Sequence, residues 1–226
     1  MNDIIITKDL SPTLYSKQFN ATYHSVNGAL QESMHVFIQN GLVHYLCTHP
    51  QLQKIHLLEV GLGTGLNCFL TYREHQKNFA DKIISYTAIE KYPLELSIIS
   101  ALSGLSPFSD NKDVFQKIHS DELVSPFNHY FTLQKHYEDI LNAINKIDTD
   151  IDIVYYDAFA PSAQSEMWDK EIFEKIYLLM KPESILVTYC AQGNFKRTLK
   201  AIGFKVEALT GAAGKREMTR ATKTSI

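Results

Sequence analysis

A glycine-rich turn gives the clearest chemical signal in this chain of 226 residues. It reads Glu59-Val-Gly-Leu-Gly-Thr-Gly-Leu-Asn67 and stands between a strand-like apolar segment and an amphipathic one. Glycine permits a tight turn with positive φ and lets backbone N–H groups approach a ligand closely. The G-x-G-x-G spacing departs from the G-x-G-x-x-G that binds a dinucleotide pyrophosphate, and the Glu59 carboxylate favours a ligand with an ammonium group. The predicted ligand-binding residues of the turn are Glu59, Gly61, Gly63, Thr64, Gly65 and Asn67.

Carboxylates also stand at the ends of two later strand-like segments. Glu90 ends segment 83–90, where a carboxylate in a Rossmann-like fold accepts hydrogen bonds from both ribose hydroxyls. Asp139 follows segment 131–135 and is a candidate partner for an adenine amino group. Each has a simpler interpretation. Glu90 would be an exposed acid at a strand end, and Asp139 an acid that favours the dipole of a helix N-terminus.

A third carboxylate, Asp157, ends segment 151–157 within the loop Asp157-Ala-Phe-Ala-Pro161. Ligands of open α/β sheets bind in the crevice at this end of the strands. The loop offers a proton acceptor, a stacking face in Phe159 and a rigid backbone at Pro161, which together suit group transfer to the amine of a planar base. Phe159 and Trp168 fit a core equally well, because large aromatic side chains more often fill a core.

The segments around these residues alternate between strand and helix patterns from about residue 54 onward, which is typical of a mostly parallel sheet covered by helices. The last two strand-like segments predict an antiparallel hairpin. Apolar residues between Leu30 and Tyr45 predict an amphipathic helix that caps the sheet. We therefore predict an α/β, Rossmann-like fold with a seven-stranded sheet. The strands are expected at 55–60, 83–90, 131–135, 151–157, 185–190, 204–209 and 216–222.

Composition predicts a single domain over 1–226, with a cap segment at 1–53 and the core at 54–226. The chain is 45% apolar and 21% charged, which excludes a disordered or fibrous protein. Its apolar runs are far shorter than the ~20 residues of a membrane span, and its N-terminus does not read as a secretory signal. We expect a soluble, cytoplasmic protein. Three isolated cysteines and dispersed histidines argue against disulfide bonds and metal binding.

Charge is distributed unevenly along the chain. Residues 196–226 contain eight basic and two acidic side chains, a net charge of +6, so residues 1–195 carry −9 of the overall −3. A basic edge of this kind suits a polyanion. A solvated helix face followed by a polar tail accounts for the same counts.

Several motifs in order resemble one known family. The glycine-rich turn is similar to the first motif of class I S-adenosylmethionine-dependent methyltransferases. Together with the other motifs it resembles the MnmC-type tRNA 5-methylaminomethyl-2-thiouridine methyltransferase family. The motifs are Gly28-Ala-Leu-Gln-Glu-Ser-Met-His-Val-Phe-Ile38, Glu59 to Asn67, Glu90-Lys-Tyr-Pro-Leu94, Asp157 to Pro161 with Met167-Trp168, and Gly214-Lys-Arg-Glu-Met218.

The resemblance implies methyl transfer from S-adenosyl-L-methionine to the aminomethyl nitrogen of the wobble uridine of tRNA. It implies that Asp157 is the active-site carboxylate and also contacts the cofactor. Motif residues that line the cofactor site would include Lys91 beside Glu90, with Asp139 as a further cofactor contact. The substrate-binding residues that it implies are Phe159, Pro161, Trp168, Lys215 and Arg216.

Members of this family also carry an FAD-dependent oxidase half, to which nothing in these 226 residues corresponds. We therefore expect no FAD, and we expect the aminomethyl nucleoside to come from another pathway or from an oxidase on a separate chain. Three other functions stay open. They are an NAD-dependent dehydrogenase, a class I methyltransferase of another small-molecule or protein amine, and a non-catalytic RNA-binding protein of methyltransferase fold.

Overall fold

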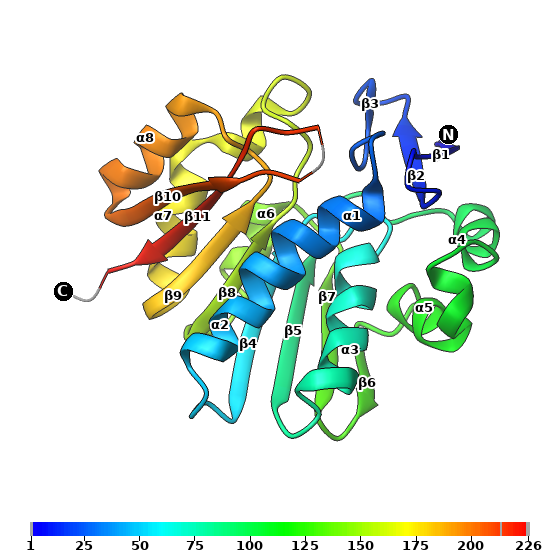
Figure 1. Ribbon diagram of the computed structural model, residues 1–226, viewed down its shortest axis with the longest axis horizontal. Helices are drawn as coiled ribbons and strands as arrows, with labels where there is room; N and C mark the ends of the chain where they lie inside the picture. The colour runs from blue at the N-terminus through cyan, green and yellow to red at the C-terminus, as the bar shows by residue number, and fades with distance from the viewer. Residues whose placement is uncertain (1, 213, 225–226) are drawn as a thin grey trace.

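The computed structural model describes residues 2–212 and 214–224, with an eight-stranded sheet at its centre (Figure 1). Five strands are parallel: β4 (Lys54–Val60), β5 (Ile83–Ile89), β7 (Phe131–His136), β8 (Ile151–Tyr156) and β9 (Met180–Thr188). Three pair antiparallel: β6 (Val124–Asn128), β10 (Phe204–Thr210) and β11 (Glu217–Lys223). The order is β10-β11-β9-β8-β4-β5-β7-β6. The α/β class, the mostly parallel sheet and the C-terminal hairpin are thereby confirmed.

The predicted number of seven strands was one too low. All seven predicted segments overlap strands, and β6 is the additional one, at the edge beside β7. Its sequence, VSPFN, includes Pro126, which lacks a backbone donor and is tolerated in a strand only at such an edge. A short segment with a proline has too weak an apolar pattern to be recognised as a strand.

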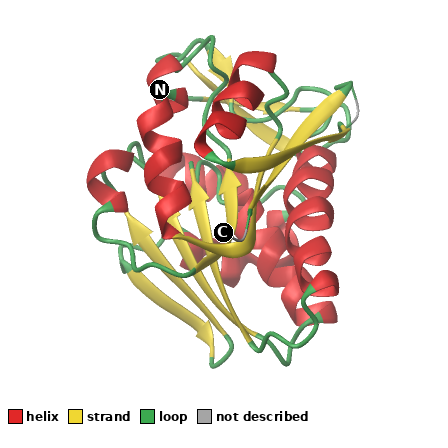
Figure 2. Cartoon of the chain, turned by 90° about the vertical axis from the view of Figure 1, so that its left-hand side faces the viewer, coloured by secondary structure: helices red, strands yellow, loops and turns green. Residues whose placement is uncertain are grey.

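Helices cover both faces of the sheet (Figure 2). The strands carry apolar residues on alternating sides, so that Ile153 and Tyr155 face one core while Val154 and Tyr156 face the other. Burial on both faces is the usual reason that a parallel strand is apolar throughout. The first core includes α3 (Leu66–Asn78), α4 (Leu96–Ser103) and α5 (Lys112–Ile118); the second includes α6 (Ile140–Ile144), α7 (Lys170–Leu179) and α8 (Gly193–Ile202).

The predicted N-terminal helix is present as three consecutive segments that cross the front of the sheet in Figure 1. They are α1 (Ala29–Ser33), the π-helical segment η1 (Met34–Val43) and α2 (His44–Thr48). The helix lies very close to the sheet at Gly41, where a Cβ would be 3.0 Å from the Tyr155 ring. Glycine at this position therefore sets the distance between helix and sheet.

A small three-stranded sheet precedes this helix and was not predicted. It consists of β1 (Asp3–Ile6), β2 (Pro12–Ser16) and β3 (Ala21–Thr22), all antiparallel. Strands this short give no readable period, which explains why the sequence did not indicate them. In Figure 1 this sheet lies above the central one. Among the described residues, no helix is long and apolar enough to cross a membrane.

The strand order changes direction at β4, which has β5 on one side and β8 on the other. The connections after β4 and β8 therefore diverge and leave a crevice at the carboxyl ends of these strands. The glycine-rich turn follows β4, Glu90 follows β5, and Asp157 follows β8. The topology thus brings the predicted chemical residues to one edge of the sheet.

Candidate active site

A cleft opens at this edge of the sheet. Predicted residues that line it are Gly61, Gly63, Glu90, Lys91, Asp139, Asp157 and Phe159. Tyr92 and Met167, which belong to two of the motifs, also line it. Residues outside the motifs contribute the rest of the wall; they include Phe19, Tyr23, Glu138, Ile140, Gln164 and Glu166. Ile140 directly follows the predicted site residue Asp139, so its position after a strand could have identified it.

The backbone of the glycine-rich turn has the conformation expected of it. Gly61, Gly63 and Gly65 have φ values of +90°, +52° and +73°, a region that side chains other than glycine rarely adopt. A Cβ on Gly61 would lie 2.6 Å from the carbonyl oxygen of Asp157, which is rigid backbone. The glycine therefore lets the turn after β4 pass directly beside the loop after β8.

Glu90 ties two of the strand-end loops together. Its Oε2 accepts a hydrogen bond from the Gly63 N–H at 2.9 Å, and its Oε1 accepts one from the Tyr92 N–H at 2.8 Å. Burial raises the pKa of the carboxyl, although these backbone donors oppose that shift. Glu90 follows β5 and lines the cleft, and its role as a ribose-binding carboxylate stays a prediction.

Lys91 and Asp139 form an ion pair across the cleft wall, with 3.0 Å between Nζ and Oδ2. Asp139 also caps α6 by accepting a hydrogen bond from the Leu141 N–H at 3.0 Å. These hydrogen bonds lower the pKa of its carboxyl. The helix-terminus interpretation of Asp139 is thus correct, and the same side chain faces the cleft.

Glu59 does not line the cleft, although the sequence suggested that its carboxylate faces a ligand. The side chain is fully buried and accepts hydrogen bonds from the Tyr86 hydroxyl at 2.8 Å and from Asn67 Nδ2 at 3.0 Å. Burial raises its pKa well above the usual value. Asn67 Nδ2 also donates to Asp157 Oδ2 at 2.8 Å. Glu59 therefore positions Asn67, and Asn67 holds Asp157.

Asp157 has the properties of a proton acceptor. Burial raises the pKa of its carboxyl to about 7, and the nearby Glu32 carboxylate adds to the shift. The Asn67 hydrogen bond and the positive charge of Lys215 act in the opposite direction. A group with a pKa close to neutrality is able both to accept and to release a proton under physiological conditions.

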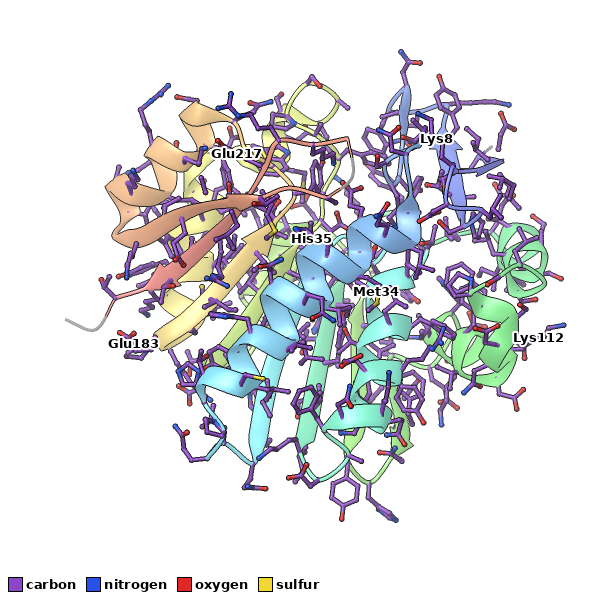
Figure 3. The ribbon with its side chains drawn as sticks, viewed as in Figure 1. Lys8, Met34, His35, Lys112, Glu183 and Glu217 are labelled. Carbon is purple, nitrogen blue, oxygen red and sulfur yellow. The ribbon has the colours of Figure 1, made fainter. Side chains whose placement is uncertain are left out.

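Side chains from distant parts of the chain surround this carboxyl. Lys215, from the loop between β10 and β11, forms an ion pair with Glu32 of α1, and its Nζ lies 4.1 Å from the centroid of the Tyr189 ring. The N-terminal helix and the C-terminal hairpin also meet nearby, where His35 Nε2 of η1 lies 2.7 Å from the carbonyl oxygen of Thr210 at the end of β10. Figure 3 labels His35 on the N-terminal helix and Glu217 on the neighbouring hairpin. Tyr189 follows β9 directly, a position that could have identified it.

The other predicted substrate residues lie in different environments. Phe159 faces the cleft and packs on Phe19, with 4.7 Å between ring centroids. Trp168 is behind the loop: its indole N–H donates to the Phe159 carbonyl oxygen at 2.7 Å, and its ring packs on Phe195 of the second core. Pro161 is not among the residues that line the cleft, and Arg216 is exposed on the hairpin.

Residues 109–224, slightly more than half of the chain, match a protein family described as S-adenosyl-L-methionine-dependent methyltransferase. The chain belongs to this family. Its cofactor is S-adenosyl-L-methionine, and the predictions of the cofactor and of a methyltransferase are confirmed.

Similar proteins support the resemblance to the MnmC-type methyltransferase family. The tRNA 5-methylaminomethyl-2-thiouridine biosynthesis bifunctional protein MnmC of Leptospira interrogans is 33% identical over 215 residues, which cover 91% of this chain and 33% of that protein. The protein of the same name from Marinomonas sp. is 29% identical, covering 91% and 32%. The methyltransferase thus spans about a third of the length of these curated relatives. The crystal structure of MNMC2 from Aquifex aeolicus, 23% identical, has the same fold, with a TM-score of 0.84 over 100% of this chain and 72% of that chain.

The glycine-rich turn of the methyltransferase suits a polar ligand. Thr64 Oγ1 and Asn67 Oδ1 are buried and have no hydrogen-bond partner among the described residues. Buried polar atoms without a partner are rare in folded proteins and call for an explanation. An ammonium and carboxylate such as those of the methionine part of the cofactor are suitable partners. No group of three or more His, Cys, Asp or Glu side chains that could hold a metal occurs within residues 2–212 and 214–224.

Proposed function

We propose that this methyltransferase methylates the aminomethyl nitrogen of 5-aminomethyl-2-thiouridine at the wobble position of tRNA. The observation that carries the proposal is that Asp157, with a pKa of about 7, lines the cleft and interacts with the ion pair in which Glu32 holds the ammonium group of Lys215. The names of the curated relatives indicate the nucleoside. A tRNA substrate would also place the enzyme in the cytoplasm.

We assign cofactor binding to backbone and carboxylate groups at the strand ends. Gly61 and Gly63, which have no side chains, would let the cofactor approach the backbone closely, Glu90 would accept hydrogen bonds from ribose hydroxyls, and Asp139 would bind an adenine amino group. S-adenosyl-L-methionine supplies a methyl group on a positively charged sulfur. Residues 54–226 would form this cofactor-binding core, to which the cap at 1–53 adds Phe19, Tyr23 and Glu32.

Asp157 would remove a proton from the substrate amine. A protonated amine has no free electron pair, so it must lose a proton before it can form a bond to carbon. Because Asn67 holds Oδ2 of Asp157, we assign proton acceptance to Oδ1. The amine proton then passes to this oxygen, and the nitrogen keeps the electron pair. Alignment of the nitrogen in the cleft would supply the rest of the rate enhancement.

For tRNA binding we propose the exposed basic residues of the C-terminal region. Of the eight basic side chains there, four are engaged within the protein: Lys196 with Glu217, Lys215 with Glu32, Arg220 with Glu207, and Lys223 with backbone carbonyls. The other four are exposed and available to phosphates: Arg197, Lys200, Lys205 and Arg216. The wobble base would leave the anticodon stack to reach the cleft, as single-stranded bases generally do in RNA readers.

The test is methylation of an anticodon stem-loop RNA that carries 5-aminomethyl-2-thiouridine at the wobble position. Matched RNAs with unmodified uridine and with 5-hydroxymethyluridine serve as controls. We expect nucleoside mass spectrometry to find one added methyl group on the aminomethyl nucleoside alone. If calorimetry shows cofactor binding but no RNA is methylated, the enzyme acts on another amine and the proposal is wrong.

A further inference from the structure

The ammonium group of Lys215 is held between a buried carboxylate and an aromatic ring. It contacts Oε1 of Glu32, and 4.1 Å separates Nζ from the centroid of the Tyr189 ring. The Glu32 side chain is 7% exposed, so this contact is largely shielded from solvent. A carboxylate beside an aromatic face is a suitable environment for a primary alkylammonium ion.

We propose that Glu32 and Tyr189 form the binding site for the ammonium group of the substrate, and that Lys215 occupies this site until the substrate displaces it. The end of a lysine side chain and a protonated aminomethyl group are the same chemical unit, a CH₂ that bears an NH₃⁺. The identity of the substrate rests on the proposed function, whereas the alkylammonium site stands on the geometry of this chain.

The two walls of the site are fixed before any ligand binds. Glu32 Oε2 accepts a hydrogen bond from the Ser25 N–H at 2.9 Å. The Tyr189 hydroxyl donates to the Ala158 carbonyl oxygen at 2.8 Å, directly after Asp157 in the chain. An ammonium held between these walls is therefore next to the proton acceptor. Preorganisation of this kind lowers the entropy lost when the ligand binds.

The charges around the site favour replacement of the Lys215 ammonium by the substrate ammonium over binding of both at once. The charged groups around the site are Glu32, Lys215 and Asp157, with Asp9 further away. His24 also adjoins it, but burial lowers the pKa of this imidazole to about 4, so it is neutral near pH 7. A second cation beside Lys215 would be repelled. Replacement of one ammonium by another leaves the net charge of the site unchanged.

Lys215 is able to leave while its backbone stays in place. Its N–H donates to the Ala212 carbonyl oxygen at 2.8 Å, and Gly211 N–H donates to the Arg216 carbonyl oxygen at 3.2 Å, so the loop is closed by its own backbone. The side chain has a flexible four-carbon stem and is 33% exposed. Rotation would carry the ammonium toward the surface where Arg216 lies.

A small amine tests the site without RNA. Lys215→Ala removes the resident ammonium and leaves room for ethylammonium, which should raise the Tm of the variant in a saturable manner. Tetramethylammonium has no N–H to donate and should not raise it, and the wild type should not respond to ethylammonium. In Lys215→Ala with Glu32→Gln the response should disappear. The proposal is overturned if ethylammonium does not raise the Tm of Lys215→Ala, or if it raises the Tm of the double variant equally.

Two stem-loop RNAs give a second test that does not depend on the Ala variant. One carries 5-aminomethyluridine at the wobble position and the other carries the neutral, similarly sized 5-hydroxymethyluridine. The wild type should bind the first more tightly, and Glu32→Gln should lower this preference by about tenfold, the usual effect of losing a hydrogen bond to a charged group. Lys215→Met should increase the preference, because the competing ammonium is gone.

Glu207→Gln is the matched control, since Glu207 pairs with Arg220 on the hairpin strands. It should leave the preference for the aminomethyl RNA unchanged. A Glu32→Gln variant with the wild-type preference contradicts the ammonium site even if methylation is normal. Failure of the wild type to methylate any RNA contradicts only the proposed function, and the ethylammonium experiment still decides the site.

Discussion

Two regions of the active site are built in different ways: the cofactor cleft, called the cofactor end, and the ammonium site beside Asp157, called the amine end. The cofactor end consists of short turns that follow β4, β5 and β7, and its key features are glycine conformations and carboxylates within a few residues of each strand. The amine end consists of single side chains from distant segments, Glu32, Tyr189 and Lys215, which interact with Asp157 of the cleft wall. Substitutions should therefore act sterically at the first end and through charge at the second.

The largest effect should follow the loss of charge at Asp157. We expect Asp157→Asn to slow single-turnover methylation of the aminomethyl RNA by on the order of 10² to 10⁴, the usual contribution of a positioned base. In the wild type the rate should rise as the pH passes through about 7, where the carboxyl loses its proton. A more alkaline buffer should partly rescue the variant, because more of the amine arrives unprotonated.

The control for this experiment is Asp110→Asn, since Asp110 is paired with Arg73 on the surface away from the cleft. Its rate should match that of the wild type. If Asp157→Asn also keeps a nearly normal rate over the whole pH range, the carboxylate has no part in proton transfer, and the proposed difference between the cofactor end and the amine end is lost.

At the cofactor end the largest effect should come from one added methyl group. Gly61→Ala would force a Cβ to within 2.6 Å of the Asp157 carbonyl oxygen, at a φ of +90°. Such strain costs about 1–3 kcal/mol, so calorimetry should show cofactor affinity reduced by roughly 5- to 150-fold. Gly104→Ala is the control, because its Cβ would meet nothing closer than 3.7 Å. Equal affinities in the two variants would refute the steric explanation.

These two ends also differ in how far the sequence could predict them. Gly61, Gly63, Glu90 and Asp139 were found because each stands in or beside a recognisable turn or strand end. The pairing of Glu32 with Lys215 joins residues 183 positions apart, which no local pattern reports. Glu59 was misplaced for a related reason, because sequence position does not tell which face of a strand is buried against Tyr86.

The aromatic residues of the cap that line the cleft could not be predicted from the sequence either. Phe19 and Tyr23 reach the cleft from a sheet whose strands are too short to predict, and they pack on Phe159 with ring centroids 4.7 and 5.0 Å away. The mostly parallel character of the large sheet was predictable from alternating periods, whereas side-chain contacts between the cap and the core depend on how the completed elements pack.

Asp157 should also influence stability, in the direction opposite to its effect on rate. Its pKa in the folded protein is about 7, above the ordinary value of 3.8, so the folded state holds the proton more tightly between these values. Wild-type stability therefore falls as the pH rises through this window. Asp157→Asn removes that loss. We expect its Tm to exceed that of the wild type above pH 7, with the difference shrinking as the pH approaches 4.

The smallest effect should come from the exposed basic residues, since each contributes one phosphate contact. Arg197→Ala with Arg216→Ala should weaken tRNA binding modestly, and the slope of log affinity against log salt should decrease by about one to two units. The control is Lys112→Ala, because Lys112 lies at the opposite edge of the molecule from Glu217 of the hairpin (Figure 3). Cofactor affinity should not change in either protein. An unchanged salt slope in the double variant would place the RNA on another surface. A reduced slope would show that tRNA approaches from the side of the hairpin, whose loop places Lys215 against Glu32 and Tyr189.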